Sequence, residues 1–212
     1  MAEVSRRPTW VAVWLLVLVV GAACGAWLLS TTVGRQALID ERVRVVEAFG
    51  GEMDDATYEG LQRRPPWMVY LLSGSRLLLA PPITLLVAAA VYYAAPARGA
   101  HVSWQQALAV TVHASVVLAL GQVVATPLHY IRESLTSPLN LATIVGVTDE
   151  GSLFGRVLGS MDLFTLWWAW LLAVGMSTLA NAPSRRSSVR VFAVYGTVAI
   201  ILAVVQGLSG GN

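Results

Sequence analysis

Charged residues are scarce in this sequence. Of its 212 residues only 12% are charged, whereas an ordinary soluble domain has about 25%. A chain with so little charge cannot cover a globule with polar surface, and hydrophobic residues make up 56% of it, with a mean hydropathy of +0.65. The composition therefore indicates a protein that uses lipid as part of its solvent.

Lysine is absent altogether, and all 14 basic residues are arginine. The arginines occur in ones and twos and never form a basic face interleaved with aromatic residues, so nucleic-acid binding is not expected. A single cysteine, Cys24, excludes a disulfide within the chain and any paired-cysteine metal or redox site. The sequence also lacks a Gly-rich phosphate loop, an HExxH motif and a GxSxG motif, so we expect no cofactor, no metal and no catalytic residues.

Long apolar runs are what the sequence does contain. A bilayer core needs about 20 mainly apolar residues for each crossing helix, and five segments qualify. The predicted spans are Trp10–Val33, Trp67–Ala95, Gln105–Thr126, Met161–Ala180 and Val191–Leu208. Tryptophans near their ends fit an aromatic belt at the membrane interface. We therefore predict an all-α, polytopic bundle of five transmembrane helices that forms a single membrane domain over residues 1–212.

Arginines in the short connections determine the predicted orientation. The N-terminal tail and the connections 96–104 and 181–190 all carry arginine, and they alternate correctly to lie on one side, taken as cytoplasmic. The two long loops, 34–66 and 127–160, then lie on the other side, as does the C-terminus. We expect a multi-pass protein of the inner (plasma) membrane.

The two long loops are predicted to have structure of their own. Loop 34–66 has apolar residues at helical spacing, interrupted by Gly50 and Gly51, so we predict two short amphipathic helices against the outer face. Loop 127–160 is unusually apolar for an exposed connection. We expect it to dip back toward the membrane or to cover the ends of the spanning helices on that side.

One charged residue lies deep inside a predicted span. Arg76 is roughly 13 Å along the second span at about 1.5 Å per residue, and an arginine near the bilayer centre costs about 2.5–3.5 kcal/mol. Asp162, at the outer start of the fourth span, is the best candidate partner. The pair is either a structural tie between two helices, the commoner arrangement, or a site for a substrate, an ion or a lipid headgroup. His113, in the third span, completes the candidate intramembrane polar site, although a hydrogen-bonded histidine between helices is the commoner outcome.

Two adjacent prolines, Pro81 and Pro82, lie in the same second span. Neither has a backbone N–H, so the carbonyls of Leu77 and Leu78 lose their helical partners. We predict a kink or a break of the helix between Leu77 and Thr84. Broken helices line the binding sites of some transporters, whereas most proline kinks only shape packing.

The fourth predicted span resembles a known family. Residues 155–181, "GRVLGSMDLFTLWWAWLLAVGMSTLAN", are similar to the bacterial branch of the Ypt-interacting-protein (YIP) domain family. The family pattern is a stretch of small residues, an acidic-aromatic "DLF", and then tryptophans and a glycine near the cytoplasmic end. Four residues match it: Asp162, Phe164, Trp167 and Gly175. The segment "SPLNL" at 137–141 also resembles the family, and the resemblance covers roughly residues 67–208, with the first span and its loop matching only in topology.

The resemblance implies five spans, a cytoplasmic N-terminus and a non-cytoplasmic C-terminus, in agreement with the arginine distribution. Eukaryotic members are associated with small-GTPase-linked vesicle traffic through a cytoplasmic N-terminal region, but only nine residues precede Trp10 here, so GTPase docking is not expected. We expect a non-enzymatic membrane protein of YIP type that organises membrane partners or lipids. The alternative is a small transporter or an accessory subunit of an envelope export system. The expected partners are the lipid bilayer and either other membrane proteins or a second copy of the chain.

Overall fold

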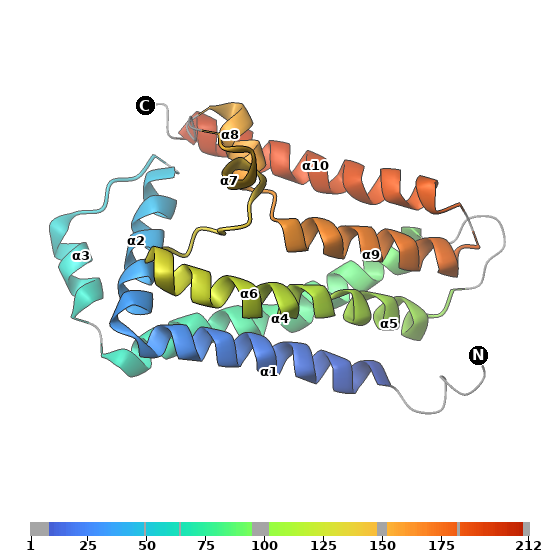
Figure 1. Cartoon of the computed structure of the whole chain (residues 1–212), viewed down its shortest axis with the longest axis horizontal. Helices are drawn as coiled ribbons and strands as arrows, with labels where there is room; N and C mark the ends of the chain where they lie inside the picture. The colour runs from blue at the N-terminus through green and yellow to red at the C-terminus, as the bar shows by residue number, and fades with distance from the viewer. Residues whose placement is uncertain are drawn as a thin grey trace. The chain divides into compact units, whose positions relative to one another are not determined.

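The computed structural model describes most of the chain, and the described parts are helical (Figure 1). The described residues are 9–48, 50–63, 65–94, 102–147, 152–181 and 183–209. Within these ranges the side chains of residues 48, 66, 68–69, 71–77, 184, 186 and 206–209 are not described. The helices are α1 (Thr9–Ser30), α2 (Thr32–Ala48), α3 (Asp55–Gln62), α4 (Pro66–Ala94), α5 (Trp104–Ala114), α6 (Val116–Arg132), α7 (Leu141–Val145), α8 (Leu153–Gly159), α9 (Leu163–Leu179) and α10 (Ser184–Ser209).

Several of the helices are apolar along their length, as membrane-spanning helices are. Three stretches in the described residues are long and apolar enough to cross a bilayer: Thr9–Ser30, Trp104–Arg132 and Ser187–Val205. Two shorter apolar stretches, Leu78–Ala94 and Leu163–Leu179, complete the apolar helices. The predicted all-α membrane bundle is confirmed, and each predicted span coincides with one of these helices. The count of five crossings itself stays a prediction.

Side chains of α1 and α10 face outward along most of their length. Only 6% of the apolar window in α1 and 11% of that in α10 is buried, against 50% in the α5–α6 stretch. Many of their exposed side chains are large and apolar, mostly leucine, isoleucine and valine, which water would solvate poorly. Membrane lipid is the medium that suits such surfaces.

The chain forms two compact units, and each long helix of α1, α4, α6 and α10 contributes to both. The first unit consists of residues Met1–Ala22, Ser75–Gln122 and Phe164–Tyr195. The second unit consists of residues Ala23–Gly74, Val123–Leu163 and Gly196–Asn212. We describe each by itself.

The core of the first unit is formed by α4, α5 and α9. Buried residues from these three helices pack together: Val91, Ala107, Ala114, Leu172 and Met176. Small residues let the helices approach closely, and Figure 1 shows α5 and α9 side by side. Tyr92 at the end of α4 meets Trp104 at the start of α5 edge to face, with ring centroids 5.9 Å apart. The start of α5 is further stabilised by a capping box between Ser103 and Gln106.

Helix α4 continues through Pro81 and Pro82 without interruption. The predicted break is therefore wrong, and a bend at this place stays a prediction. The hydroxyl of Thr84 donates a hydrogen bond of 2.8 Å to the carbonyl of Ala80, within the turn that contains the two prolines. Each proline removes one backbone donor but already has a helical φ, so the helix can continue when neighbouring groups supply the missing contacts. The side chains of Ser73 and Ser75, two such candidates, lie outside the described residues.

The third span has a local irregularity at Ser115, within an apolar helical stretch that runs over Trp104–Arg132. Ser115 separates α5 from α6, and its backbone N–H bonds to the carbonyls of both Thr111 and Val112 at 3.1 Å. Its hydroxyl donates to the carbonyl of Thr111 at 2.9 Å. Serine hydroxyls that bond back along a helix in this way often bend it.

In the second unit, the predicted helices of loop 34–66 are present as α2 and α3. Helix α2 follows α1 almost directly, because Thr31 caps it by accepting a hydrogen bond from the N–H of Gly34 at 2.9 Å. A Cβ at Gly34 would overlap the backbone of Leu28, so this turn requires glycine. The guanidinium of Arg35 donates to the carbonyls of Leu29 and Ser30, which end α1. The first span thus ends three residues earlier than the predicted Val33.

Two contacts hold the long helices and short helices of the second unit together. Trp27 of α1 packs against Tyr130 of α6, with ring centroids 5.7 Å apart. The side-chain amide of Gln36 on α2 donates to the hydroxyl of Tyr58 on α3 at 2.9 Å. Helices α7 and α8 pack against each other, and both expose large apolar side chains: Ile144, Val145, Leu153 and Phe154.

Candidate functional site

The segment between α6 and α7 has a defined conformation that starts at the end of α6. Glu133 has a left-handed φ of 52°, which ends the helix. The Nδ1–H of His129 donates to the carbonyl of Ser134 at 2.8 Å. From α2, Arg44 donates to the hydroxyl of Thr136 and forms an ion pair with Glu41 on its own helix at 2.6 Å. These contacts hold the "SPLNL" segment in one place.

Asn140 is the buried polar residue of that segment. Only 4% of it is exposed, and a buried amide is costly unless it is hydrogen-bonded. Its Oδ1 accepts a bond of 2.7 Å from the N–H of Thr143, which caps α7. Its Nδ2 donates to the carbonyl of Ser137 at 2.8 Å. Asn140 therefore shapes the segment from within.

The same segment is joined to the start of α9. Asn140 and Asp162 form an antiparallel bridge, in which Leu141 N–H donates to the Met161 carbonyl at 2.8 Å and Leu163 N–H donates to the Leu139 carbonyl at 3.1 Å. We call Ser137, Asn140 and Asp162, with this bridge, the Asp162 clamp. It brings together two sequence motifs that are 25 positions apart.

Asp162 and Ser137 are joined directly within the clamp. The hydroxyl of Ser137 donates to Oδ2 of Asp162 and accepts a hydrogen bond of 3.3 Å from the N–H of Leu139. The hydroxyl proton and one lone pair of Ser137 are thus both used inside the clamp. This arrangement fixes the segment against the start of α9.

The motif residues on α9 serve close packing between helices. A Cβ added at Gly121 of α6 would lie 2.8 Å from Cγ of Phe164. One added at Gly175 would overlap the side chain of Val110 on α5. Phe164 also stacks on Trp167, with ring centroids 6.3 Å apart and planes inclined by 29°. Phe164 and Gly175 are therefore places where α9 lies close to α6 and to α5.

The candidate intramembrane residues Arg76 and His113 have separate outcomes. The side chain of Arg76 lies outside the described residues, so its pairing with Asp162 stays a prediction; Ser137 is one hydrogen-bond partner of Asp162 in the structure. His113 is exposed, and its Nδ1–H donates to the carbonyl of Ala109, one turn earlier on α5, at 2.7 Å. In the described part of the chain no group of three or more His, Cys, Asp or Glu residues could hold a metal ion.

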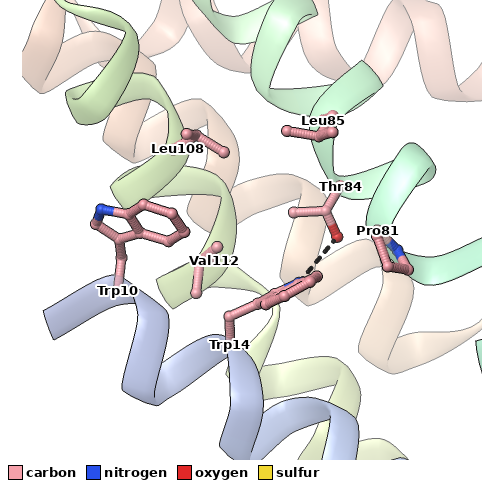
Figure 2. Close-up of a pocket in the computed structure, with 7 residues that line it drawn as sticks. All are labelled: Trp10, Trp14, Pro81, Thr84, Leu85, Leu108 and Val112. Atoms are coloured by element: carbon pink, nitrogen blue, oxygen red, sulfur yellow. Dashed lines mark hydrogen bonds between the residues drawn. The ribbon is translucent and has the colours of Figure 1, made fainter. Parts of the chain in front are cut away.

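An apolar cavity of about 170 Å³ lies in the first unit, between α1, α4 and α5 (Figure 2). Seven residues line it: Trp10, Trp14, Pro81, Thr84, Leu85, Leu108 and Val112. The indole N–H of Trp14 donates to the hydroxyl of Thr84 across one side of the cavity, at 3.4 Å. Sequence reasoning missed this cavity, although Trp10 and Trp14 are four positions apart and so share a face of α1.

The geometry is that of an α-helical integral membrane protein whose motif residues join helices to one another. The chain matches the family model of the Yip1 domain over residues 1–206. It therefore belongs to the Yip1 domain family, as the "DLF" motif and its surroundings indicate. The match is wider than the expected range of roughly 67–208, because it includes the first span and its loop. No curated protein and no solved structure matches the chain.

Proposed function

We propose that this chain is a non-enzymatic membrane protein of YIP type that organises membrane partners or lipids. The observation that carries the proposal is the set of contacts that the family-motif residues make. Asp162 binds the hydroxyl of Ser137 in the clamp, Phe164 packs on Gly121, and Gly175 makes room for Val110. Residues used in this way build a rigid scaffold in the membrane. A scaffold acts through the surfaces that it presents to lipids and to other proteins.

The proposed location is the inner membrane of a bacterium, with the N-terminus in the cytoplasm and the C-terminus outside. The five predicted crossings of the bilayer and the arginines of the short connections support this orientation. Reporter fusions after Arg98 and Arg186 should both give a cytoplasmic signal. A periplasmic signal at either position would reverse the proposed topology or change the number of spans.

The proposed activity is tested by extracting the protein from its membrane into polymer nanodiscs. Mass spectrometry then compares the lipids that remain bound, and the membrane proteins cross-linked to it, with the composition of the bulk membrane. We expect a distinct set of lipids or partners with the wild type. Gly175→Val should reduce this selectivity, because its side chain forces α9 away from Val110.

The matched control is Gly21→Ala, where an added Cβ meets nothing within 4 Å. This variant should retain the wild-type set of lipids and partners. A bound fraction identical to the bulk membrane would overturn the proposal. Solute uptake into proteoliposomes that depends on Arg76 or His113 would instead support the alternative, a small transporter.

A further inference from the structure

The cavity between α1, α4 and α5 is too small for a whole drug-sized ligand and large enough for part of a hydrophobic chain. Ligand pockets for drug-sized molecules have volumes of about 300–1,000 Å³, whereas a dry apolar cavity of about 150 Å³ holds a ligand the size of benzene. The volume here is about 170 Å³. It therefore accommodates a short segment of a ligand whose remainder lies outside.

The cavity wall offers almost no polar group to such a ligand. The Trp14 N–H is directed to the hydroxyl of Thr84, and that hydroxyl donates its own proton to the carbonyl of Ala80 at 2.8 Å. Figure 2 shows the nitrogen of Trp10 on the side that faces away from the other lining residues. A polar solute would lose its hydrogen bonds to water on entry and find no replacement. Hydrocarbon is the chemistry that fits the wall.

The burial of the lining residues runs from a closed floor to an open rim. Val112 and Leu108 form the floor, being 0% and 6% exposed, whereas Leu85 on the rim is 49% exposed. The neighbouring Leu86 is 71% exposed and does not line the cavity. The opening therefore lies beside the outward-facing apolar surface of α4, where bilayer lipid surrounds a spanning helix.

The cavity lies close to one end of a span. Trp10 is the second residue of α1, and Trp14 follows one turn later, about 6 Å along the helix axis at 1.5 Å per residue. Tryptophan is enriched at the boundary between headgroups and hydrocarbon. A lipid whose headgroup lies at that boundary has the upper part of its acyl chain at the depth of this cavity.

We infer that the cavity binds a segment of the acyl chain of a bilayer lipid. Trp10, Trp14 and Leu85 contact the chain at the rim, and Pro81, Thr84 and Leu108 contact it further in. The site deepens the proposed function, on which it rests, because it names the part of a lipid that the scaffold holds. It differs from ordinary lipid contact because the chain enters between helices.

Photolabelling tests the site. The full-length protein is reconstituted in nanodiscs with a phosphatidylcholine that carries a diazirine on the upper part of one acyl chain. After irradiation, mass spectrometry maps the labelled residues. A chain in the cavity labels the lining residues Trp14, Thr84 and Leu108 above the level of Leu78 and Leu86, which face outward. Label confined to outward-facing residues would overturn the inference.

A pair of adjacent substitutions gives the matched control. Leu85→Phe adds volume at the rim and should lower the labelling of Thr84 and Leu108 several-fold. Leu86→Phe makes the same change at the next position, outside the cavity, and should leave the labelling unchanged. Equal labelling in both variants would also overturn the site. Should Leu85→Phe fail to fold, the labelling pattern of the wild type alone decides.

The outcome is separable from that of the proposed function. Selective retention of lipids or partner proteins without label in the cavity would refute the acyl-chain site and leave the scaffold proposal in place. Label in the cavity without any selectivity for lipids or partners would keep the site and refute the organising role.

Discussion

Replacing Gly121 by alanine adds a single methyl group beside the motif residue Phe164 and so tests how closely the two residues pack. A Cβ at Gly121 would lie 2.8 Å from Cγ and 2.9 Å from Cβ of Phe164. Both atoms are close to the backbone of α9, so the overlap cannot be relieved by moving the far end of a side chain. Gly121→Ala therefore requires α6 and the start of α9 to move apart.

Two effects of opposite sign determine how much Gly121→Ala changes the free energy of unfolding. Overpacking a core costs typically about 1–3 kcal/mol, whereas replacing glycine by alanine inside a helix stabilises it by about 0.8–1.0 kcal/mol. Because the overlap is with atoms that cannot swing away, we expect overpacking to exceed the gain. The net loss in the free energy of unfolding is about 1 kcal/mol, equivalent to a fall in Tm of roughly 2–4 °C for a chain of this size.

Thermal unfolding in nanodiscs, followed by circular dichroism, measures this change. Gly21→Ala is the control, because its Cβ meets nothing within 4 Å and the gain in helix propensity is unopposed, so its Tm should stay or rise. In a double-mutant cycle with Phe164→Ala, the double variant should lose less stability than the sum of the single losses, because the contact with Cγ is gone. A Tm of Gly121→Ala at or above that of the wild type would refute the close contact.

Three further predictions concern the clamp, Arg76 and the loop helices. Asp162→Ala and Ser137→Ala should each destabilise the protein by about 1.5–3 kcal/mol, as expected for a hydrogen bond to a charged group. The double variant should lose little more stability than either single variant. Additive losses in thermal unfolding would contradict the clamp. If Arg76 also pairs with Asp162, Arg76→Ala and Asp162→Ala should each lower the amount of folded protein in the membrane fraction, and the double variant should recover part of that loss. Strictly additive losses would reject the pair. An environment-sensitive dye can be attached to Phe154→Cys in a chain whose own cysteine is removed by Cys24→Ser. In vesicles the dye should report apolar surroundings, because α8 exposes large apolar side chains. A fully aqueous signal would show that the loop does not dip back to the membrane.

The prolines show where a local rule is insufficient. The missing N–H groups of Pro81 and Pro82 are visible in the sequence, and they predict a kink or a break. Whether a helix breaks depends on what surrounds it, because neighbouring side chains and packing can replace one lost hydrogen bond. Helix α4 continues through the prolines, while the third span has a local irregularity at Ser115, where a hydroxyl bonds to a helix carbonyl.

The sequence by itself determined the class of this protein, because the length and apolarity of a segment are properties of that segment alone. Its spans, the short helices of the first long loop and the family motif around Asp162 could all be recognised locally. The contacts that build the sites required the tertiary structure, since they join residues that are distant in the chain. Ser137 meets Asp162 only because the "SPLNL" segment forms a bridge with the start of α9. The cavity likewise exists only where Trp14, Thr84 and Leu108, from three different helices, surround a space that none of them encloses alone.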